Sequence, residues 1–212
     1  MTYIIDKLNG HHEPQEEKVF YEVMQRITRS ENNLIIELGA YWSYYSMWFV
    51  KEASGRAVIV EPNIKKLEAG LANFRLNNLA CTALNGFVGR SYGKESVFVD
   101  WNSAKSVIPC YSVDYLMKHL GVSGRLTILH SDTQGAEYDM LLGAGESLKA
   151  RNIDYIFIST HVHKHKSCLN ILTRYGYHII ASHGIKESAS ADGLIVASSP
   201  RIEKFNVEIT KN

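Results

Sequence analysis

Two glutamates follow apolar runs in a pattern that could hold a nucleoside-like ligand. Glu37 ends a run that begins at Leu34 and is followed by Gly39, while Glu61 ends a second run over residues 57–60. In an open α/β sheet such ligands bind beyond the carboxyl ends of the strands, and an acid after the second strand holds ribose hydroxyls. Gly39 would let the backbone approach the ligand without a Cβ atom. The spacing predicts a cofactor site between these strand ends, with Glu61 on the ribose.

The turn after the first strand lacks the three-glycine fingerprint of dinucleotide sites. Tyr41 and Ser43 occupy the positions where further glycines would fall, and they leave less room for a pyrophosphate. This favours a nucleoside cofactor without phosphates, such as S-adenosylmethionine, over NAD. An ordinary strand-to-helix corner that binds nothing is the alternative.

Two further polar residues at strand ends are candidates for proton transfer. Asp132 follows the apolar run over residues 125–130, and His161 follows the run over residues 153–159. Polar groups at the carboxyl end of a central strand are commonly functional, although Asp132 could also cap the next helix. The pKa of a histidine lies near operating pH, which suits His161 to the role of general base.

His161, His163 and His165 alternate and would share one face of an extended strand. No nearby cysteine or acid completes a recognisable zinc spacing, so we expect no metal site. We expect His161 to face the site, and the other two to lie in a loop or at a helix start. Near residue 85, an Asn-Gly pair marks either a plain turn or flat backbone beside an adenine ring.

Alternating strands and helices must position these residues. Helical spacing predicts a first helix between residues 11 and 30 that packs beside the first strand and can cover the ligand; its histidines, His11 and His12, are more simply explained as exposed. Further helices are predicted after Gly39 and over residues 64–77, 113–120, 136–142 and 167–175, and strands over 34–36, 57–60, 81–84, 125–130, 153–159, 177–182 and 193–197.

Several segments carry weaker signals. Residues 96–100 alternate like an edge strand, and residues 102–111 resemble a loop. Ser112 can cap the helix that follows it, and Asp114 suits the first turn of that helix. The polar segment 183–192 either approaches the site or joins two strands as a hairpin. The tail after residue 199 shows no pattern.

Composition bounds the class of protein. With 212 residues, 45% of them hydrophobic, the chain can form one domain with a sizeable core. The net charge of +1 does not favour nucleic-acid binding. The first residues do not show the long apolar stretch of a signal peptide, and no run approaches the length that spans a bilayer, so we expect no membrane association. Three separated cysteines favour reduced thiols in a cytoplasmic protein.

Three motifs together resemble the FkbM-like family of S-adenosylmethionine-dependent methyltransferases. The first is ELGAYWSYYS at the first strand, where Ser43 replaces the family's second glycine. The second is EPN after the second strand, followed by ANFRLNNL. The third is DTQGAEYDMLLG, in which Gln134 stands where the family often has a glutamate. The resemblance covers nearly the whole chain.

The resemblance implies an α/β fold. Its core would be a three-layer α-β-α sandwich around a seven-stranded, mostly parallel Rossmann-like sheet with one antiparallel strand. It implies a single methyltransferase domain over residues 1–212, with a helical lead-in (1–32), the core (33–199) and a tail (200–212). Family members commonly methylate hydroxyl groups of natural products and sugars. The expected activity is O-methylation of a small-molecule acceptor, with S-adenosylhomocysteine as the product.

The resemblance and the strand-end positions together assign expected roles to residues. Glu37, with the backbone of Gly39 and Ala40, holds the methionine end of the cofactor. Asp132 lies near the methionine amine or the acceptor, and the general base is His161 or, second, Asp132. The other expected cofactor contacts are Tyr41, Ser43, Glu61, Pro62, Asn63, Asn85, Gly86 and Phe87, and the expected acceptor contacts are Gln134 and His163.

The sequence leaves three alternative functions open. An NAD-linked oxidoreductase would use the same sheet, and a non-catalytic module would bind the cofactor without turnover. A catechol-type, metal-dependent methyltransferase would need acids that the sequence does not reveal beyond Asp132. The sequence also leaves open whether the chain forms a homodimer.

Overall fold

A seven-stranded sheet forms the centre of the molecule in this computed structural model, which describes residues 8–99, 105–120, 124–161 and 163–211. The strands lie in the order β3-β2-β1-β7-β8-β10-β9. β10 pairs antiparallel with both β8 and β9, whereas the other neighbours pair in parallel. The bounds are β1 (Leu34–Leu38), β2 (Arg56–Glu61), β3 (Thr82–Asn85), β7 (Leu126–Ser131), β8 (Ile153–Thr160), β9 (His178–His183) and β10 (Gly193–Ser198). The predicted mostly parallel sheet with one antiparallel strand is confirmed.

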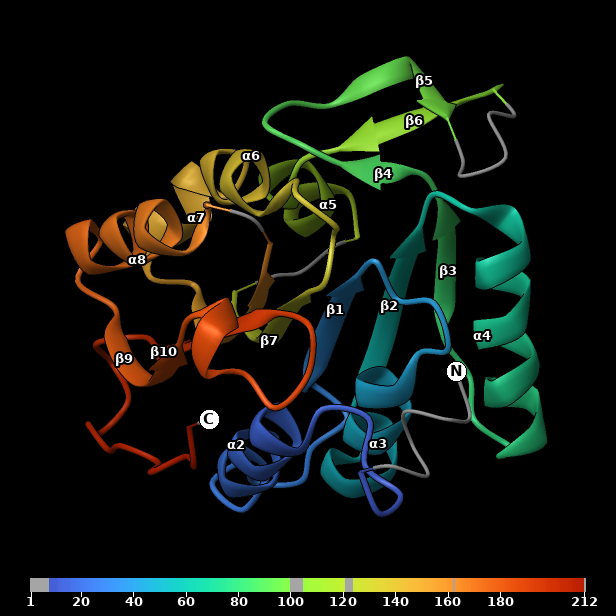
Figure 1. Ribbon diagram of the computed structural model, residues 1–212. Helices are drawn as coiled ribbons and strands as arrows, with labels where there is room; N and C mark the ends of the chain where they lie inside the picture. The colour runs from blue at the N-terminus through green and yellow to red at the C-terminus, as the bar shows by residue number, and fades with distance from the viewer. Residues whose placement is uncertain (1–7, 100–104, 121–123, 162, 212) are drawn as a thin grey trace.

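Helices cover both faces of this sheet, which gives the predicted three layers (Figure 1). One face carries α2 (Pro14–Met24), α3 (Tyr44–Ala53) and α4 (Ile64–Leu76). The other carries α5 (Val113–His119), α6 (Glu137–Leu142), α7 (Gly145–Ala150) and α8 (His165–Arg174). Side chains alternate along each strand, so Ile36 packs into one core and Ile35 into the other.

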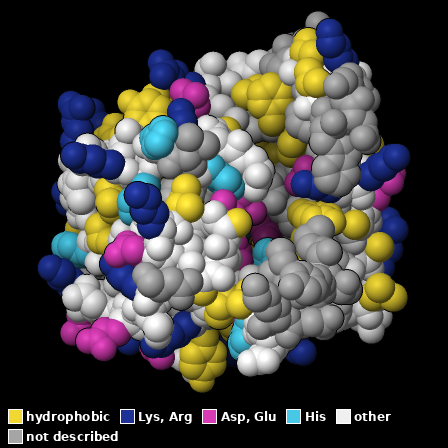
Figure 2. Space-filling view, viewed as in Figure 1, with side chains coloured by type: hydrophobic (Ala, Val, Ile, Leu, Met, Phe, Trp, Pro, Cys, Tyr) yellow, Lys and Arg dark blue, Asp and Glu magenta, His cyan; other side chains and the backbone are white. Residues whose placement is uncertain are grey.

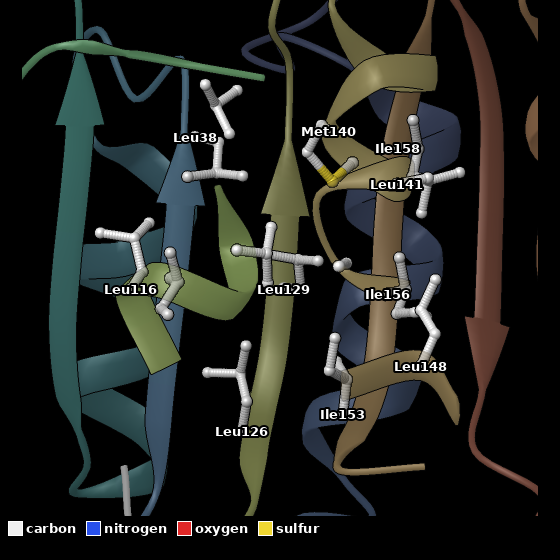
Figure 3. Close-up of a cluster of buried hydrophobic side chains, with 14 of the residues drawn as sticks. Leu38, Leu116, Leu126, Leu129, Met140, Leu141, Leu148, Ile153, Ile156 and Ile158 are labelled. Atoms are coloured by element: carbon white, nitrogen blue, oxygen red, sulfur yellow. The ribbon is translucent and has the colours of Figure 1, made fainter. Parts of the chain in front are cut away.

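The core between the sheet and α5–α8 is built from branched aliphatic side chains. Figure 3 shows Leu38, Leu129 and Ile156 pointing from neighbouring strands toward Leu116 and Leu148 on the covering helices. All five are at most 1% exposed. Burying a leucine or isoleucine side chain contributes roughly 1.5–3 kcal/mol to the stability of the fold. This packing holds the strands in place, and with them the polar residues at their carboxyl ends.

A second, three-stranded sheet lies beyond the carboxyl ends of β2 and β3 (Figure 1). It consists of β4 (Phe87–Val88), β5 (Gly93–Val99) and β6 (Lys105–Tyr111) in the order β4-β6-β5. The edge strand predicted near residue 96 is therefore real, but the predicted loop at 102–111 is wrong over β6. Pro109 falls at the register shift between β5 and β6, where its missing N–H costs no regular ladder bond.

Asp114 serves a different helix from the one expected. Ser112 caps α5 as predicted, because its Oγ accepts a hydrogen bond from Tyr115 N. The carboxylate of Asp114 instead accepts hydrogen bonds from Glu146 N, Ser147 N and Ser147 Oγ, at 2.9, 2.9 and 2.6 Å. It therefore caps the N-terminus of α7, a helix that the sequence did not predict.

The C-terminal tail, which showed no sequence pattern, packs along α2 and β9. Val207 N donates to Ile180 O at 3.1 Å, and Lys18 Nζ donates to Glu208 O at 2.6 Å. The Arg26 guanidinium lies 4.1 Å from the centre of the Phe205 ring. The tail thus holds α2 against the sheet.

Candidate active site

An open cavity of about 1300 Å³ lies at the carboxyl ends of β1, β2 and β7. The second sheet, the start of α2 and residues 189–192 complete its walls. Figure 2 shows this hollow in the middle of the viewed face, with acidic side chains gathered inside it. Its position matches the switch point where open α/β sheets bind ligands. The cavity is large enough for a nucleoside cofactor and a small acceptor together, since ligand pockets typically measure ~300–1,000 Å³.

The turn after β1 requires a glycine at position 39. Gly39 has a φ of +76°, and a Cβ there would lie 1.9 Å from the carbonyl oxygen of Asp132. The N–H groups of Gly39 and Ala40 both donate to Val60 O, at 2.8 and 3.2 Å. The turn is therefore pulled against β2 and β7, which places the ends of all three strands around one cavity.

Glu61 stands at the end of β2 and is held by backbone groups. Its two carboxylate oxygens accept hydrogen bonds from Tyr41 N at 3.2 Å and Asn63 N at 2.9 Å. Burial raises the pKa of Glu61, and these backbone hydrogen bonds offset only part of that rise. Each oxygen keeps a lone pair for a further donor, so a ribose diol in the cavity could donate to both.

Glu37 lines the cavity but already has a structural task. It is 3% exposed, and its Oε2 accepts a hydrogen bond from Ser46 N at 3.0 Å in the first turn of α3. Burial raises the pKa of this carboxyl group. Its contact with the methionine end of a cofactor stays a prediction.

Asp132 and Asp192 bracket the ring of His161 at the cavity wall. His161 Nε2 lies 3.0 Å from Asp192 Oδ1 and 3.5 Å from Asp132 Oδ1. The amide nitrogen of Gln134 lies 2.9 Å from the same ring nitrogen and donates to Asp132 Oδ1 at 3.2 Å. Asp132, Gln134 and Asp192 line the cavity, and the His161 side chain, 12% exposed, lies behind them.

The other ring nitrogen of His161 faces Glu137. Nδ1 of His161 donates to Glu137 Oε1, which also accepts from Gly135 N at 2.8 Å. Burial opposes the charged imidazolium, but hydrogen bonds to Asp192 and Glu137 outweigh it and raise the pKa of His161 to about 10. Burial raises the pKa of Asp132, and the nearby His161 offsets part of that rise. In this arrangement both ring nitrogens of His161 face neighbouring side chains.

Helix α2 brings a second acidic group to the cavity. Glu13 and Glu17 line it, while Glu16 accepts hydrogen bonds from His130 Nε2 at 2.8 Å and Ser159 Oγ at 3.0 Å. Burial raises the pKa of Glu13 to about 9 and of Glu16 to about 8. The start of the predicted first helix thus borders the cavity, and whether the helix covers a ligand stays a prediction. Of the described residues that line the cavity, six are acidic and one, Lys66, is basic.

Most of the predicted site residues meet at this cavity. Those that line it are Glu37, Gly39, Ala40, Tyr41, Glu61, Pro62, Asn63, Gly86, Phe87, Asp132 and Gln134. A glycine is needed at position 86 because of packing within the protein. A Cβ there would lie 2.5 Å from the Tyr111 ring.

Four of the expected site residues do not line the cavity in this structure. Ser43 is fully buried, and a Cβ on Gly70 would lie 2.5 Å from its Oγ, so Ser43 packs against α4 instead of lining the cavity. Asn85 donates to the carbonyl oxygens of Glu61 and Pro62, both at 3.0 Å, and positions that turn. His163 is exposed and does not line the cavity. His161 faces carboxylates at both ring nitrogens, and its role as general base stays a prediction.

Sequence reasoning missed several cavity residues. Asp192 belongs to the polar segment 183–192, for which a position near the site was one of two alternatives. His130 was counted only as part of a strand, and His12 was expected to be exposed, yet both line the cavity. Val97 and Val99 on β5 also line it. Asp192 lies just before a buried strand and His130 within one, and a polar residue in such a position is the sequence signal that could have indicated the cavity.

Comparisons with known proteins agree with this architecture. The sequence matches the family described as "Methyltransferase FkbM domain" over residues 22–179, well over half of the chain. No curated protein matches the sequence. Solved structures that share less than 25% sequence identity with this chain show its fold and nothing more.

Three solved structures illustrate the shared fold. Precorrin-6y C5,15-methyltransferase from Geobacter metallireducens has a TM-score of 0.55 at 13% identity, covering 85% of this chain and 87% of that chain. M. capricolum TrmK with S-adenosylhomocysteine has a TM-score of 0.51 at 14% identity, covering 90% and 70%. Streptococcus pneumoniae Sp1610 with S-adenosylmethionine has a TM-score of 0.51 at 10% identity, covering 91% and 75%.

Family membership decides among the activities that the sheet alone left open. An NAD-linked oxidoreductase is not favoured, because the family match is to a methyltransferase domain and the turn lacks the dinucleotide fingerprint.

Within the part of the chain that the structure describes, no helix is long and apolar enough to cross a membrane. The chain belongs to the FkbM family of methyltransferases, which use S-adenosylmethionine as the methyl donor.

Proposed function

We propose that this enzyme transfers the methyl group of S-adenosylmethionine to a hydroxyl oxygen of a small-molecule acceptor. The observation that carries this proposal is that Glu61 and Asp132 face one cavity from the ends of β2 and β7. Glu61 would hold the ribose, and Glu37 with the Gly39–Ala40 backbone would hold the methionine end. This arrangement leaves the Asp132 side of the cavity to the acceptor.

The reaction is an in-line displacement at the sulfonium carbon. The bond from sulfur to the methyl carbon breaks, its electron pair stays on sulfur, and a new bond forms to the acceptor oxygen. Because the sulfonium is already activated, the protein mainly aligns the reacting atoms, which can contribute ~7–11 kcal/mol in favourable cases. The acceptor hydroxyl must also lose its proton, and a positioned base typically adds ~10²–10⁴-fold in rate.

Asp132 is the better of the two expected bases. Its side chain is 30% exposed and lines the cavity, whereas both nitrogens of His161 face other side chains. In this proposal Asp132 takes the proton and His161 holds the Asp132 carboxylate in place. His161 is therefore a positioning residue.

The lining favours a small, partly apolar acceptor over RNA. Glu17 and Asp192 line the cavity with carboxylates, which would repel phosphates. Val97 and Val99 supply an apolar wall from the second sheet and are 61% and 51% exposed. Exposed valines beside a cavity are suited to cover the hydrophobic part of an acceptor.

A labelled methyl group tests the reaction. Purified protein is incubated with S-adenosylmethionine carrying a ¹³C-methyl group and a panel of hydroxylated small molecules, and products are examined by NMR and mass spectrometry. The proposal expects a methyl ether and S-adenosylhomocysteine. Transfer to nitrogen or carbon would overturn the O-methylation assignment, and cofactor binding without product across a broad panel would indicate a non-catalytic module.

The base assignment is tested with the acceptor that this screen identifies. Asp132→Asn is expected to lower kcat by ~10²–10⁴-fold and to leave the Kd for S-adenosylhomocysteine within a few-fold. Asp139→Asn is a suitable control, because Asp139 is an exposed acid on α6 that pairs with Arg90. An Asp132→Asn variant with wild-type kcat would rule out Asp132 as the base.

A further inference from the structure

One cluster at the cavity wall joins three elements that the fold brings together from distant parts of the chain. Asp132 follows β7, His161 follows β8, and Asp192 precedes β10. One donor atom from each residue lies within 4.8 Å of the other two. Donors bound at ~2.0–2.2 Å to a common ion are on the order of 3 Å apart. The observed separations of 3.0 and 3.5 Å from His161 Nε2 are close to that value.

The histidine is oriented as metal ligands usually are. A metal-binding imidazole commonly donates its second N–H to a carboxylate, which fixes the ring and its tautomer. Here Nδ1 of His161 donates to Glu137, and Nε2 is thereby directed at the two aspartates. Glu137 is fully buried, and among the described residues its second oxygen, Oε2, has no hydrogen-bond partner. Burying a carboxylate without a full set of hydrogen bonds is unfavourable. A positive charge nearby, such as a bound cation, would offset that cost.

We propose that Asp132, His161 and Asp192 bind one divalent cation of the first transition row. Two carboxylates and one imidazole form a mixed donor set that suits Mn²⁺, Fe²⁺, Co²⁺ or Zn²⁺ better than the all-oxygen sites typical of Ca²⁺. Three protein ligands leave coordination positions for water or a substrate oxygen, as in catalytic rather than structural sites. Asp132 and Asp192 both line the cavity, so these open positions face the acceptor.

The consequence for catalysis rests on the proposed function. An acceptor hydroxyl that coordinates the cation would release its proton more readily, because the ion stabilises the alkoxide that forms. The alkoxide oxygen then attacks the methyl carbon, and sulfur retains the electron pair of the broken bond. Asp132 would bind the cation through one carboxylate oxygen, which leaves its other oxygen to accept the hydroxyl proton, as in the proposed function. The cation site itself does not depend on which atom is methylated.

Binding of Mn²⁺ can be measured without substrate. Protein freed of metals by chelation is titrated with Mn²⁺, and the unbound ion is followed by its electron paramagnetic resonance signal. The proposal expects one Mn²⁺ per chain, with a Kd weakened at least tenfold by Asp192→Asn. Glu137→Gln is expected to weaken binding by ~10–100-fold, as is typical for the carboxylate behind a histidine ligand.

Controls separate loss of the site from loss of the fold. Asp139→Asn, an exposed acid on the neighbouring helix α6, should bind Mn²⁺ as the wild type does. S-adenosylhomocysteine affinity, measured by calorimetry on each variant, reports whether the cavity is intact. Wild-type protein that leaves Mn²⁺ free at millimolar concentration, or Asp192→Asn with unchanged affinity, would overturn the cation site.

The cation site and the proposed function can fail separately. Methyl transfer that continues in excess chelator, with no Mn²⁺ bound, would refute the cation and leave O-methylation standing. Stoichiometric Mn²⁺ binding by a protein that methylates no hydroxyl would refute the function and leave the cation site.

Discussion

At residue 39 the backbone leaves no room for a side chain. Gly39 combines a φ of +76° with a Cβ position only 1.9 Å from the backbone oxygen of Asp132. Gly176, at the end of α8, has a similar φ of +82°, but a Cβ there would make only an ordinary contact of 3.7 Å with the Arg151 side chain. The two glycines therefore separate the cost of an unfavourable φ from the cost of a collision.

We expect Gly39→Ala to destabilise the protein more than Gly176→Ala. A left-handed conformation costs a non-glycine residue about 1–3 kcal/mol, which is the loss expected for Gly176→Ala. Gly39→Ala must also push β1 and β7 apart, so its loss should be larger and should include cofactor affinity. Chemical denaturation of both variants measures the difference. Equal losses would show that the turn is not packed as described.

The cysteines allow a pH-dependent prediction at the same scale. Burial raises the pKa of Cys81 to about 11 and of Cys168 to about 12. Because the thiolate is the reactive form, alkylation of these residues should be slow at pH 8 and should accelerate as the pH rises toward those values. We expect iodoacetamide to label Cys81 at least tenfold more slowly in native than in urea-unfolded protein. Equal rates by mass spectrometry would contradict its burial.

At the scale of elements, Asp114 ties α5 to α7. Its carboxylate accepts three hydrogen bonds from the first turn of α7, and loss of a helix cap typically costs about 0.5–2 kcal/mol. We expect Asp114→Ala to lower the free energy of unfolding by an amount in this range. Asp139→Ala, which removes an exposed ion pair with Arg90 at 3.3 Å, should change it by less than about 0.5 kcal/mol. Urea denaturation compares the two.

The elements that follow local rules could be predicted from the sequence. β1, β2 and β7 are short apolar runs, and α4 shows helical spacing with Asn63 as its N-cap. These elements placed Gly39, Glu61 and Asp132 correctly around the cavity. The fold class followed from their alternation.

Other features depend on contacts between distant residues and carried no local signal. β6 was expected to be a loop, and its pairing with β5 accommodates Pro109 at a register shift. Asp192 and Glu13 reach the cavity only through the packing of β10 and α2. His161 was correctly placed near the site. Its role as base stays a prediction, and the sequence could not show that Glu137 and Asp192 face its two nitrogens.

At the scale of the whole molecule, the tail and α2 stabilise one another. Ile202, Phe205, Val207 and Ile209 are half-buried against the core beneath α2. Glu13 and Glu17, at the start of α2, line the cavity. Loss of tail packing should therefore reach the site through the position of α2.

We expect Phe205→Ala to lower the thermal midpoint by several degrees and to weaken S-adenosylhomocysteine binding. A loss of 1 kcal/mol shifts the midpoint of a domain this size by about 2–4 °C, and Phe205 also loses its contact with Arg26. The exposed neighbour Glu203 provides the control Glu203→Ala, which should leave both quantities unchanged. Differential scanning calorimetry and binding calorimetry give the two readouts. Unchanged behaviour of Phe205→Ala would show that the tail is dispensable.

The central claim is that the cavity beyond β1, β2 and β7 holds S-adenosylmethionine with Glu61 on the ribose. Calorimetric titration with S-adenosylhomocysteine of wild-type protein, Glu61→Gln and the exposed-helix control Glu68→Gln tests it most directly. Hydrogen bonds to a charged group contribute about 1.5–3 kcal/mol, so Glu61→Gln should weaken binding at least tenfold and Glu68→Gln should not. Equal affinity of the wild type and Glu61→Gln would contradict the account.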